Sequence, residues 1–125
     1  MSDDKRLLLE AAAIGAGYKA LNGKVYGIVG LHQARKTYDL LCDNDLYWNP
    51  LEDDGDAFRL ACAMDIELDW FNNIQNLPDT SNRAFVRAFR QGNANKQSYT
   101  DKKSKEAAAR LAIVKLTIKI GKARQ

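Results

Sequence analysis

The chain has 125 residues, of which 28% are charged and 46% are hydrophobic, and its formal net charge at pH 7 is +3. This composition excludes a disordered chain, which would need lower hydrophobicity and a higher net charge, and the length suits a single domain, 1–125, with its own core. No apolar run approaches the roughly 20 residues that a membrane-spanning helix needs. Because the first residues also lack the basic and long apolar regions of a signal peptide, we expect a cytoplasmic protein with no membrane partner.

The N-terminal segment predicts a helix. Asp3 or Asp4 can begin it, and Gly15 and Gly17 can end it, since glycine is the usual residue just beyond a helix end. The apolar side of this helix is expected to contain Leu7, Leu8, Ala11, Ala12 and Ile14.

Residues 18–29 predict a β-hairpin around Asn22-Gly23, the strongest short hairpin signal. A two-residue turn sets the register, which pairs Leu21 with Lys24 and Ala20 with Val25. The face expected to meet the core then contains Tyr18, Ala20, Val25, Gly27 and Val29.

Residues 31–46 fit two kinds of secondary structure. A helix would align Leu31, Ala34, Tyr38, Leu41 and Cys42, whereas a strand would place Tyr38, Leu40 and Cys42 on one face. Periodicity over so short a run does not decide between them, so both remain open from the residues alone.

A distinctive string, 48–61, follows. Asn49 precedes a proline and is therefore biased toward an extended conformation, and Pro50 suits a turn or a first helical turn. Asp53 or Asp54 can cap a helix that runs from about 53 to 64. The apolar positions with helical spacing in this segment are Ala57, Leu60, Ala61 and Met64.

Metal binding is the alternative explanation of the acids in this string. Asp53, Asp54 and Asp56 lack the ligand spacing and the terminal glutamate of an EF-hand loop. The chain contains one histidine, His32, and no CxxC motif, so a zinc site would need an unusual carboxylate-rich ligand set. We therefore favour helix capping and solubility for these acids, and we predict no metal site and no cofactor.

The mid-chain string resembles that of small accessory proteins of tailed phages and prophages, which carry a WNPL(T/E)DDGDA(L/F)RLA motif. The matching residues here are Trp48-Asn49-Pro50-Leu51, Asp53-Asp54-Gly55-Asp56-Ala57 and Arg59-Leu60-Ala61. An N-terminal helix that ends near Ala16-Gly17-Tyr18 and a C-terminal Ile120-Gly121-Lys122-Ala123 fit the same order. The resemblance implies a compact αβα-layered domain, with strands at 31–46 and 83–90.

The remaining segments complete the predicted fold. In 66–71, Ile66, Leu68 and Trp70 alternate with polar residues as in a half-buried strand, and 77–82 has turn chemistry. Taken alone, the pattern of residues 83–90 favours a helix over a strand, but we favour the strand that the resemblance implies because the sheet needs a further partner. Residues 91–98 suggest a polar loop, and a last helix, capped by Thr100 or Asp101, should reach about Gly121. Its packing side is expected to contain Ala107, Leu111, Ile113, Val114, Leu116, Ile118 and Ile120.

The sequence therefore predicts an α+β fold: a small antiparallel sheet, made of the hairpin and one to three further strands, packed with three helices in an αβα-layered single domain. The two cysteines are too few for a disulfide scaffold. Cys62 lies in an apolar run and is expected to be a small buried hydrophobe.

Charge is divided unevenly along the chain. Residues 1–100 carry 11 basic and 14 acidic side chains, residues 101–125 carry 8 basic and 2 acidic ones, and 39–69 holds 10 acids against one arginine. The first candidate site is an acidic region that faces a basic partner surface: Glu52, Asp53, Asp54 and Asp56. A solvated acidic surface explains the same residues.

The alternative candidate site is a basic surface for nucleic acid, made of Arg83, Arg87, Arg90, Lys115, Lys119 and Lys122. No helix-turn-helix, zinc finger or RNP string accompanies these residues. The chain also lacks GxGxxG, phosphate-binding-loop, GxSxG and HExxH motifs, so we predict no catalytic residues.

We therefore expect a non-catalytic binding protein whose partner is a host or phage protein. The phage resemblance implies a bacterial host cytoplasm and a role in modifying or inhibiting host machinery, including host defence. Nucleic acid is the alternative partner. The oligomeric state stays open, since an exposed hairpin strand would allow pairing across a dimer.

Overall fold

The computed structural model describes residues 2–71, 84–99 and 102–124. Its helices are α1 (Ser2–Gly15), α2 (Asp54–Ala63) and α3 (Lys102–Ala123). Its strands are β1 (Lys19–Leu21), β2 (Lys24–Tyr26), β3 (Leu40–Leu41), β4 (Tyr47–Trp48), β5 (Glu67–Phe71), β6 (Ala84–Arg90) and β7 (Asn93–Tyr99). The α+β fold with three helices is confirmed within these ranges. None of the helices described has the length and apolar character needed to cross a bilayer.

The strands form two sheets rather than the single sheet expected. The first has the order β1-β2-β3-β4 and includes one parallel pair, β2 with β3, while the second is an antiparallel sheet with the order β5-β6-β7. The strand reading of 83–90 is confirmed by β6, although Arg83 and the predicted turn at 77–82 lie outside the described residues.

Strand β7 corrects the prediction of a polar loop at 91–98. Gln91 and Gly92 both have positive φ, 43° and 88°, and they form a two-residue turn of the kind that joins hairpin strands. The backbone of β7 pairs with β6 along its whole length. Because these backbone hydrogen bonds do not require apolar side chains, a polar edge strand forms where the composition suggested a loop.

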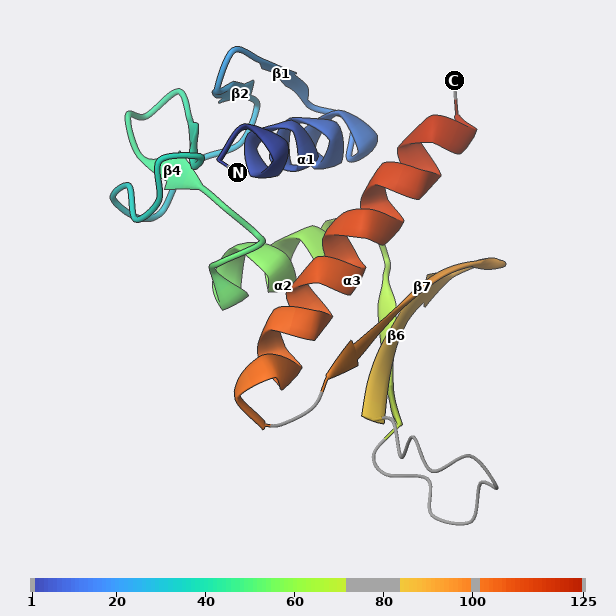
Figure 1. Cartoon of the computed structure of the whole chain (residues 1–125). Helices are drawn as coiled ribbons and strands as arrows, with labels where there is room; N and C mark the ends of the chain where they lie inside the picture. The colour runs from blue at the N-terminus through green and yellow to red at the C-terminus, as the bar shows by residue number, and fades with distance from the viewer. Residues whose placement is uncertain (1, 72–83, 100–101, 125) are drawn as a thin grey trace.

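Helix α3 lies at the centre of the molecule (Figure 1). It packs against α1 and α2 and also against β6 and β7. Its buried residues therefore cover more than one stripe of the helix: Ala108, Ala109, Ala112, Ile113, Val114, Leu116, Thr117 and Ile120. Three residues of the packing side expected from the sequence are not fully buried: Leu111 and Ile118 are half-buried, and Ala107 is exposed. The buried residues of α3 are instead those that face its neighbours α1, α2, β6 and β7.

The crossing of α1 and α3 brings two backbones together. A Cβ added to Gly15 would lie 2.5 Å from the carbonyl oxygen of Thr117, and one added to Gly121 would lie 2.4 Å from the Cα of Gly15. This approach turns Leu9, Ala12 and Ala13 toward the core. The apolar side predicted for α1 is therefore partly wrong, since Leu7 and Ile14 are exposed.

The hairpin of β1 and β2 has the predicted register. Asn22 and Gly23 have φ values of 54° and 80°, as a type I′ turn requires, and Ala20 and Val25 are buried. The core face ends earlier than expected, however. The chain leaves the strand at Gly27, whose φ is 96°, so Val29 points outward and is 68% exposed.

Residues 31–46 form neither a helix nor a long strand. The strand reading holds only for Leu40–Leu41, and an isolated bridge joins His32 to Tyr47. Side chains hold the rest of the segment: Asn44 bonds both the N–H and the carbonyl of Gly30, and Asp39 accepts a hydrogen bond from the N–H of Arg35. Polar side chains thus satisfy the backbone here in place of a regular ladder.

Candidate functional site

The candidate site lies around the N-terminus of α2. Residue Asp53 caps this helix, as the sequence predicted. Asp53 is the N-cap, with φ −114° and ψ 119°, and its carboxylate accepts a 2.8 Å hydrogen bond from the N–H of Asp56. Before it, the side-chain oxygen of Asn49 accepts hydrogen bonds from the N–H groups of Leu51 and Glu52. These bonds satisfy backbone donors that would otherwise be unpaired at the helix start.

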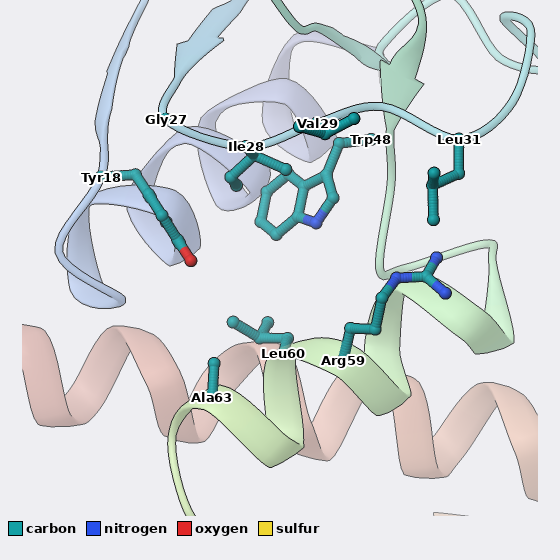
Figure 2. Close-up of a pocket in the computed structure, with 9 residues that line it drawn as sticks. All are labelled: Tyr18, Gly27, Ile28, Val29, Leu31, Trp48, Arg59, Leu60 and Ala63. Carbon is teal, nitrogen blue, oxygen red and sulfur yellow. The ribbon is translucent and has the colours of Figure 1, made fainter.

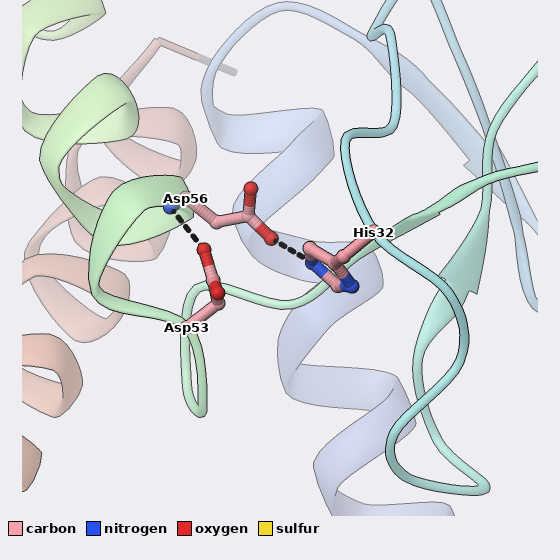
Figure 3. Close-up of side chains that lie close together, drawn as sticks. All are labelled: His32, Asp53 and Asp56. Atoms are coloured by element: carbon pink, nitrogen blue, oxygen red, sulfur yellow. Dashed lines mark hydrogen bonds and ion pairs between the residues drawn. The ribbon is translucent and has the colours of Figure 1, made fainter.

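Asp56 is the most deeply buried acid of this string, with a side chain only 2% exposed. Its Oδ2 accepts hydrogen bonds from His32 Nε2 at 2.7 Å and from the Asn49 N–H at 2.8 Å, and its Oδ1 accepts one from Arg59 at 2.7 Å. Figure 3 shows His32 reaching Asp56 from the loop that precedes β3. A buried carboxylate of this kind is tolerated because charged and neutral donors surround it.

His32 uses both of its ring nitrogens. Nδ1 lies 3.0 Å from the carbonyl oxygen of Gln33, which can only accept, and Nε2 faces the carboxylate of Asp56. Burial lowers the pKa of His32, but these hydrogen bonds and the charges of Asp56 and Asp53 outweigh it, so the pKa lies above its ordinary value. The geometry fits an imidazolium that donates from both nitrogens.

The pKa of the Asp53 carboxyl is shifted in the opposite direction, below its usual value. Burial by itself would raise this pKa. The hydrogen bond from the Asp56 N–H and the positive charges of His32 and Arg35 lower it by more than burial raises it. His32, Asp53 and Asp56 each offer one ligand atom, and these atoms lie within 4.8 Å of one another. Hydrogen bonds to chain donors already use these atoms, so the cluster is explained as the cap of α2.

All four acids of the predicted partner-facing region receive hydrogen bonds from within the chain. Beyond Asp53 and Asp56, Glu52 accepts one of 2.6 Å from the hydroxyl of Tyr38, and Asp54 accepts one from Arg110 of α3. Among the three aspartates, only Asp54 is mostly exposed, at 69%. The region therefore acts mainly as a structural junction between α2, α3 and the 31–46 segment.

Next to this junction is an open pocket of about 280 Å³ between α2 and the 27–31 loop. Figure 2 shows Trp48 and Ile28 on one side and Leu60 and Ala63 of α2 on the other. Tyr18 and Arg59 lie at its two ends. The complete lining is Tyr18, Gly27, Ile28, Val29, Leu31, Trp48, Arg59, Leu60 and Ala63.

Two donors accompany the apolar walls of the pocket. The indole of Trp48 is 4% exposed, and its nitrogen faces the pocket (Figure 2) with no hydrogen-bond partner in the described part of the chain. The guanidinium of Arg59 is fixed by Asp56 and lies 3.8 Å from Asp53. Apolar walls with a few oriented polar groups are typical of binding pockets.

The pocket lining contains no pair of nucleophile and base, since serine, cysteine, histidine and acidic residues are absent from it. The two thiols are elsewhere, and their burial corrects the prediction for Cys62: it is exposed, and Cys42 is the buried one. Burial, followed by the charges of Asp56 and Asp43, raises the pKa of the Cys42 thiol to about 11.

The predicted nucleic-acid residues are dispersed over two elements. Arg87 forms an ion pair with Asp69 at 2.5 Å, and Arg90 lines a hollow beside the end of α3. Lys115, Lys119 and Lys122 are exposed on α3, and the Nζ of Lys119 lies 3.4 Å from the carbonyl oxygen of Ala94 in β7.

The sequence did not reveal the pocket. Its lining comes from the turn between α1 and β1, the loop after β2, strand β4 and helix α2, and no local motif links these segments. Comparison of the chain with protein families, with curated proteins and with solved structures finds no significant match.

Proposed function

We propose that this chain is a non-catalytic binding protein that holds a protein partner at the pocket between α2 and the 27–31 loop. The observation that carries this proposal is the exposure of large apolar residues at the pocket. Leu31 is 56% exposed and Val29 is still more exposed, and both line the pocket.

An apolar surface of this kind supports protein binding for a physical reason. Contiguous exposed apolar residues around a pocket mark interaction surfaces, and a partner gains most of its affinity from one or two apolar anchors in such a pocket. The free indole N–H of Trp48 would add one oriented hydrogen bond to a carbonyl or carboxylate of the partner. The expected partner segment therefore carries an apolar side chain next to a hydrogen-bond acceptor.

We assign Glu52, Asp53, Asp54 and Asp56 a different role in this function from the partner-facing one expected from the sequence. Because they are bonded within the chain, they fix α2 and Arg59 beside the pocket rather than offering a free acidic surface. We propose that they position the binding surface and do not form it.

The biological setting rests on the resemblance of the 48–61 string to phage accessory proteins. On that basis the partner is a host or phage protein in the bacterial cytoplasm, and binding blocks or redirects it, as a factor that inhibits a host defence component would do. A protein that acts by covering a site on a larger one needs no chemistry of its own.

The test is a pull-down from lysate of the bacterial host, with and without nuclease, using wild type and two matched variants. Leu31→Ser removes an apolar residue of the pocket, and Leu7→Ser removes an equally exposed leucine of α1 that does not line it. We expect one host protein to be retained by wild type and by L7S, and lost by L31S, in both nuclease conditions. The purified host protein should then bind directly with the same pattern.

Retention that is equal for both leucine variants would place the interface elsewhere and overturn the proposal. Retention that disappears on nuclease treatment would do the same, because nucleic acid would then be the ligand.

A further inference from the structure

The second sheet has one face that no described helix covers. Val86 and Ala88 of β6 are fully buried against α3, so the alternate residues Phe85, Arg87 and Phe89 point to the opposite face. In Figure 1, α3 crosses only one side of this sheet. The face that carries Phe85, Arg87 and Phe89 is called the outer face below.

The strand register places further residues on the outer face. Phe71 of β5 is paired with Phe85, and Lys96 of β7 is paired with Arg87. Three phenylalanines and two cations therefore share one surface. Such a surface departs from the usual alternation, in which the face of a sheet that is not packed on the core is polar.

The rings and cations on the outer face touch one another in order. Phe71 and Phe85 are stacked with centroids 4.5 Å apart. The guanidinium of Arg87 lies 5.0 Å from the centroid of Phe89 and 5.8 Å from that of Phe71, and the Nζ of Lys96 lies 5.2 Å from that of Phe85. Phe85 and Phe89 are half-buried, and each ring has one cation beside it, Lys96 and Arg87 respectively. The ion pair with Asp69 also holds Arg87.

Positive charge lies near the β7 edge of this sheet, on α3, which packs on the side opposite the outer face. Residues 84–125 include 11 basic and 2 acidic side chains, and three exposed lysines lie on α3, which packs against β7: Lys115, Lys119 and Lys122. Lys119 reaches the backbone of β7 at Ala94. The acids of the outer face, Glu67 and Asp69, both belong to the opposite edge strand, β5, and Asp69 is paired with Arg87.

We propose that the outer face of the β5-β6-β7 sheet binds single-stranded nucleic acid along β6 and β7. Bases stack on Phe85 and Phe89 in the places held by Lys96 and Arg87, and these cations move onto the phosphates. Aromatic rings that take bases beside a basic track are what single-strand recognition requires. Helix α3 packs against α1, α2, β6 and β7, so its neighbours limit how it could enter a duplex groove.

This inference is independent of the proposed function, because the outer face and the α2 pocket share no residue. It shares Arg87 with the basic surface expected from the sequence, but that surface was made of arginines and lysines alone and included no aromatic residue. Loss of one kind of binding would therefore leave the other intact.

The test is fluorescence anisotropy with labelled dT12, U12 and a 12-base-pair duplex, at low salt and over a salt titration. We expect wild type to bind a single strand at least about tenfold more tightly than the duplex, with affinity that falls as salt rises. Lys96→Glu should weaken single-strand binding about tenfold or more and lower the salt dependence by about one ion. Lys24→Glu, the same change at an exposed lysine of the other sheet, should change it less than threefold.

The stacking part of the proposal has its own pair of variants. Phe89→Leu keeps an apolar side chain but removes the ring, and it should weaken binding about tenfold, the cost of one stacked base. Phe58→Leu, at the exposed ring of α2, should have no effect. Circular dichroism checks that each variant is folded.

The inference would be overturned by no single-strand binding by wild type at low salt, by equal affinity for the duplex, or by equal effects of the two lysine variants. Unchanged binding by folded F89L would also overturn it, because attraction by charge alone would then explain the affinity.

Discussion

The backbone N–H of Asn49 donates a 2.8 Å hydrogen bond to the buried carboxylate of Asp56. Asn49 follows the last strand of the first sheet and Asp56 lies in the first turn of α2, so this bond ties the sheet to the helix. The same carboxylate accepts hydrogen bonds from the side chains of His32 and Arg59.

Replacing Asp56 by asparagine should destabilise the protein strongly. The amide keeps one acceptor but presents an NH₂ group to donors, and removing one partner of a buried ionic network costs about 3–5 kcal/mol. Asp54→Asn is the matched control: Asp54 is 69% exposed and pairs with Arg110, and a surface ion pair contributes about 0–1 kcal/mol. Urea unfolding at pH 7 measures both. Equal losses would show that burial of Asp56 does not matter.

His32 should make stability depend on pH. Because its folded pKa is raised above 6.5, its contribution is fully present below about pH 6.5 and is lost as the pH rises through the folded pKa. The difference in unfolding free energy between wild type and His32→Gln should therefore be larger at pH 5.5 than at pH 8.5, by about 1–2 kcal/mol for a charge-assisted hydrogen bond.

The pH range of that experiment must stay above 5. The pKa of Asp53 is lowered in the fold, so its stabilisation is present at higher pH and is lost as the pH falls through its range, which would mask the effect of His32. A difference between wild type and H32Q that is the same at pH 5.5 and 8.5 would contradict the role given to His32.

Gly15→Ala and Gly121→Ala should each destabilise the packing of α1 on α3. The added methyl groups would meet backbone atoms at 2.5 and 2.4 Å, which cannot move without separating the helices, and overpacking of this kind costs about 1–3 kcal/mol. In Gly55→Ala the new methyl would meet only the ends of the Arg59 and Asp53 side chains, at 3.1 and 3.2 Å. Thermal unfolding should show a much smaller change for G55A.

The two thiols should react at very different rates in the folded protein. Cys62 is exposed, whereas Cys42 is buried and has a pKa raised to about 11, and only the thiolate reacts. Titration with Ellman's reagent at pH 8 should show one fast thiol, which Cys62→Ser removes and Cys42→Ser leaves in place. Two fast thiols in folded wild type would mean that the Cys42 environment opens.

Local interactions explain what the sequence predicted well. The turn at Asn22-Gly23 requires only that both residues adopt positive φ, and the start of α2 requires only that Asp53 reach the N–H of Asp56, three residues away. Such features depend on neighbouring residues, so the hairpin register and the helix cap could be predicted from the string itself. The mixture of helical and alternating patterns along the chain likewise indicated the α+β class.

The tertiary structure alone decided which surfaces are buried and which side chains meet. Arg110 reaches Asp54 across 56 positions of sequence, and His32 reaches Asp56 across 24; these contacts turn an acidic string into a structural junction. The side of α1 that faces the core was set by the close approach of Gly15 to α3, and the polar β7 was set by backbone pairing with β6. The pocket and the outer face were not predictable because each joins strands and helices whose contact depends on the whole fold, not on any local pattern.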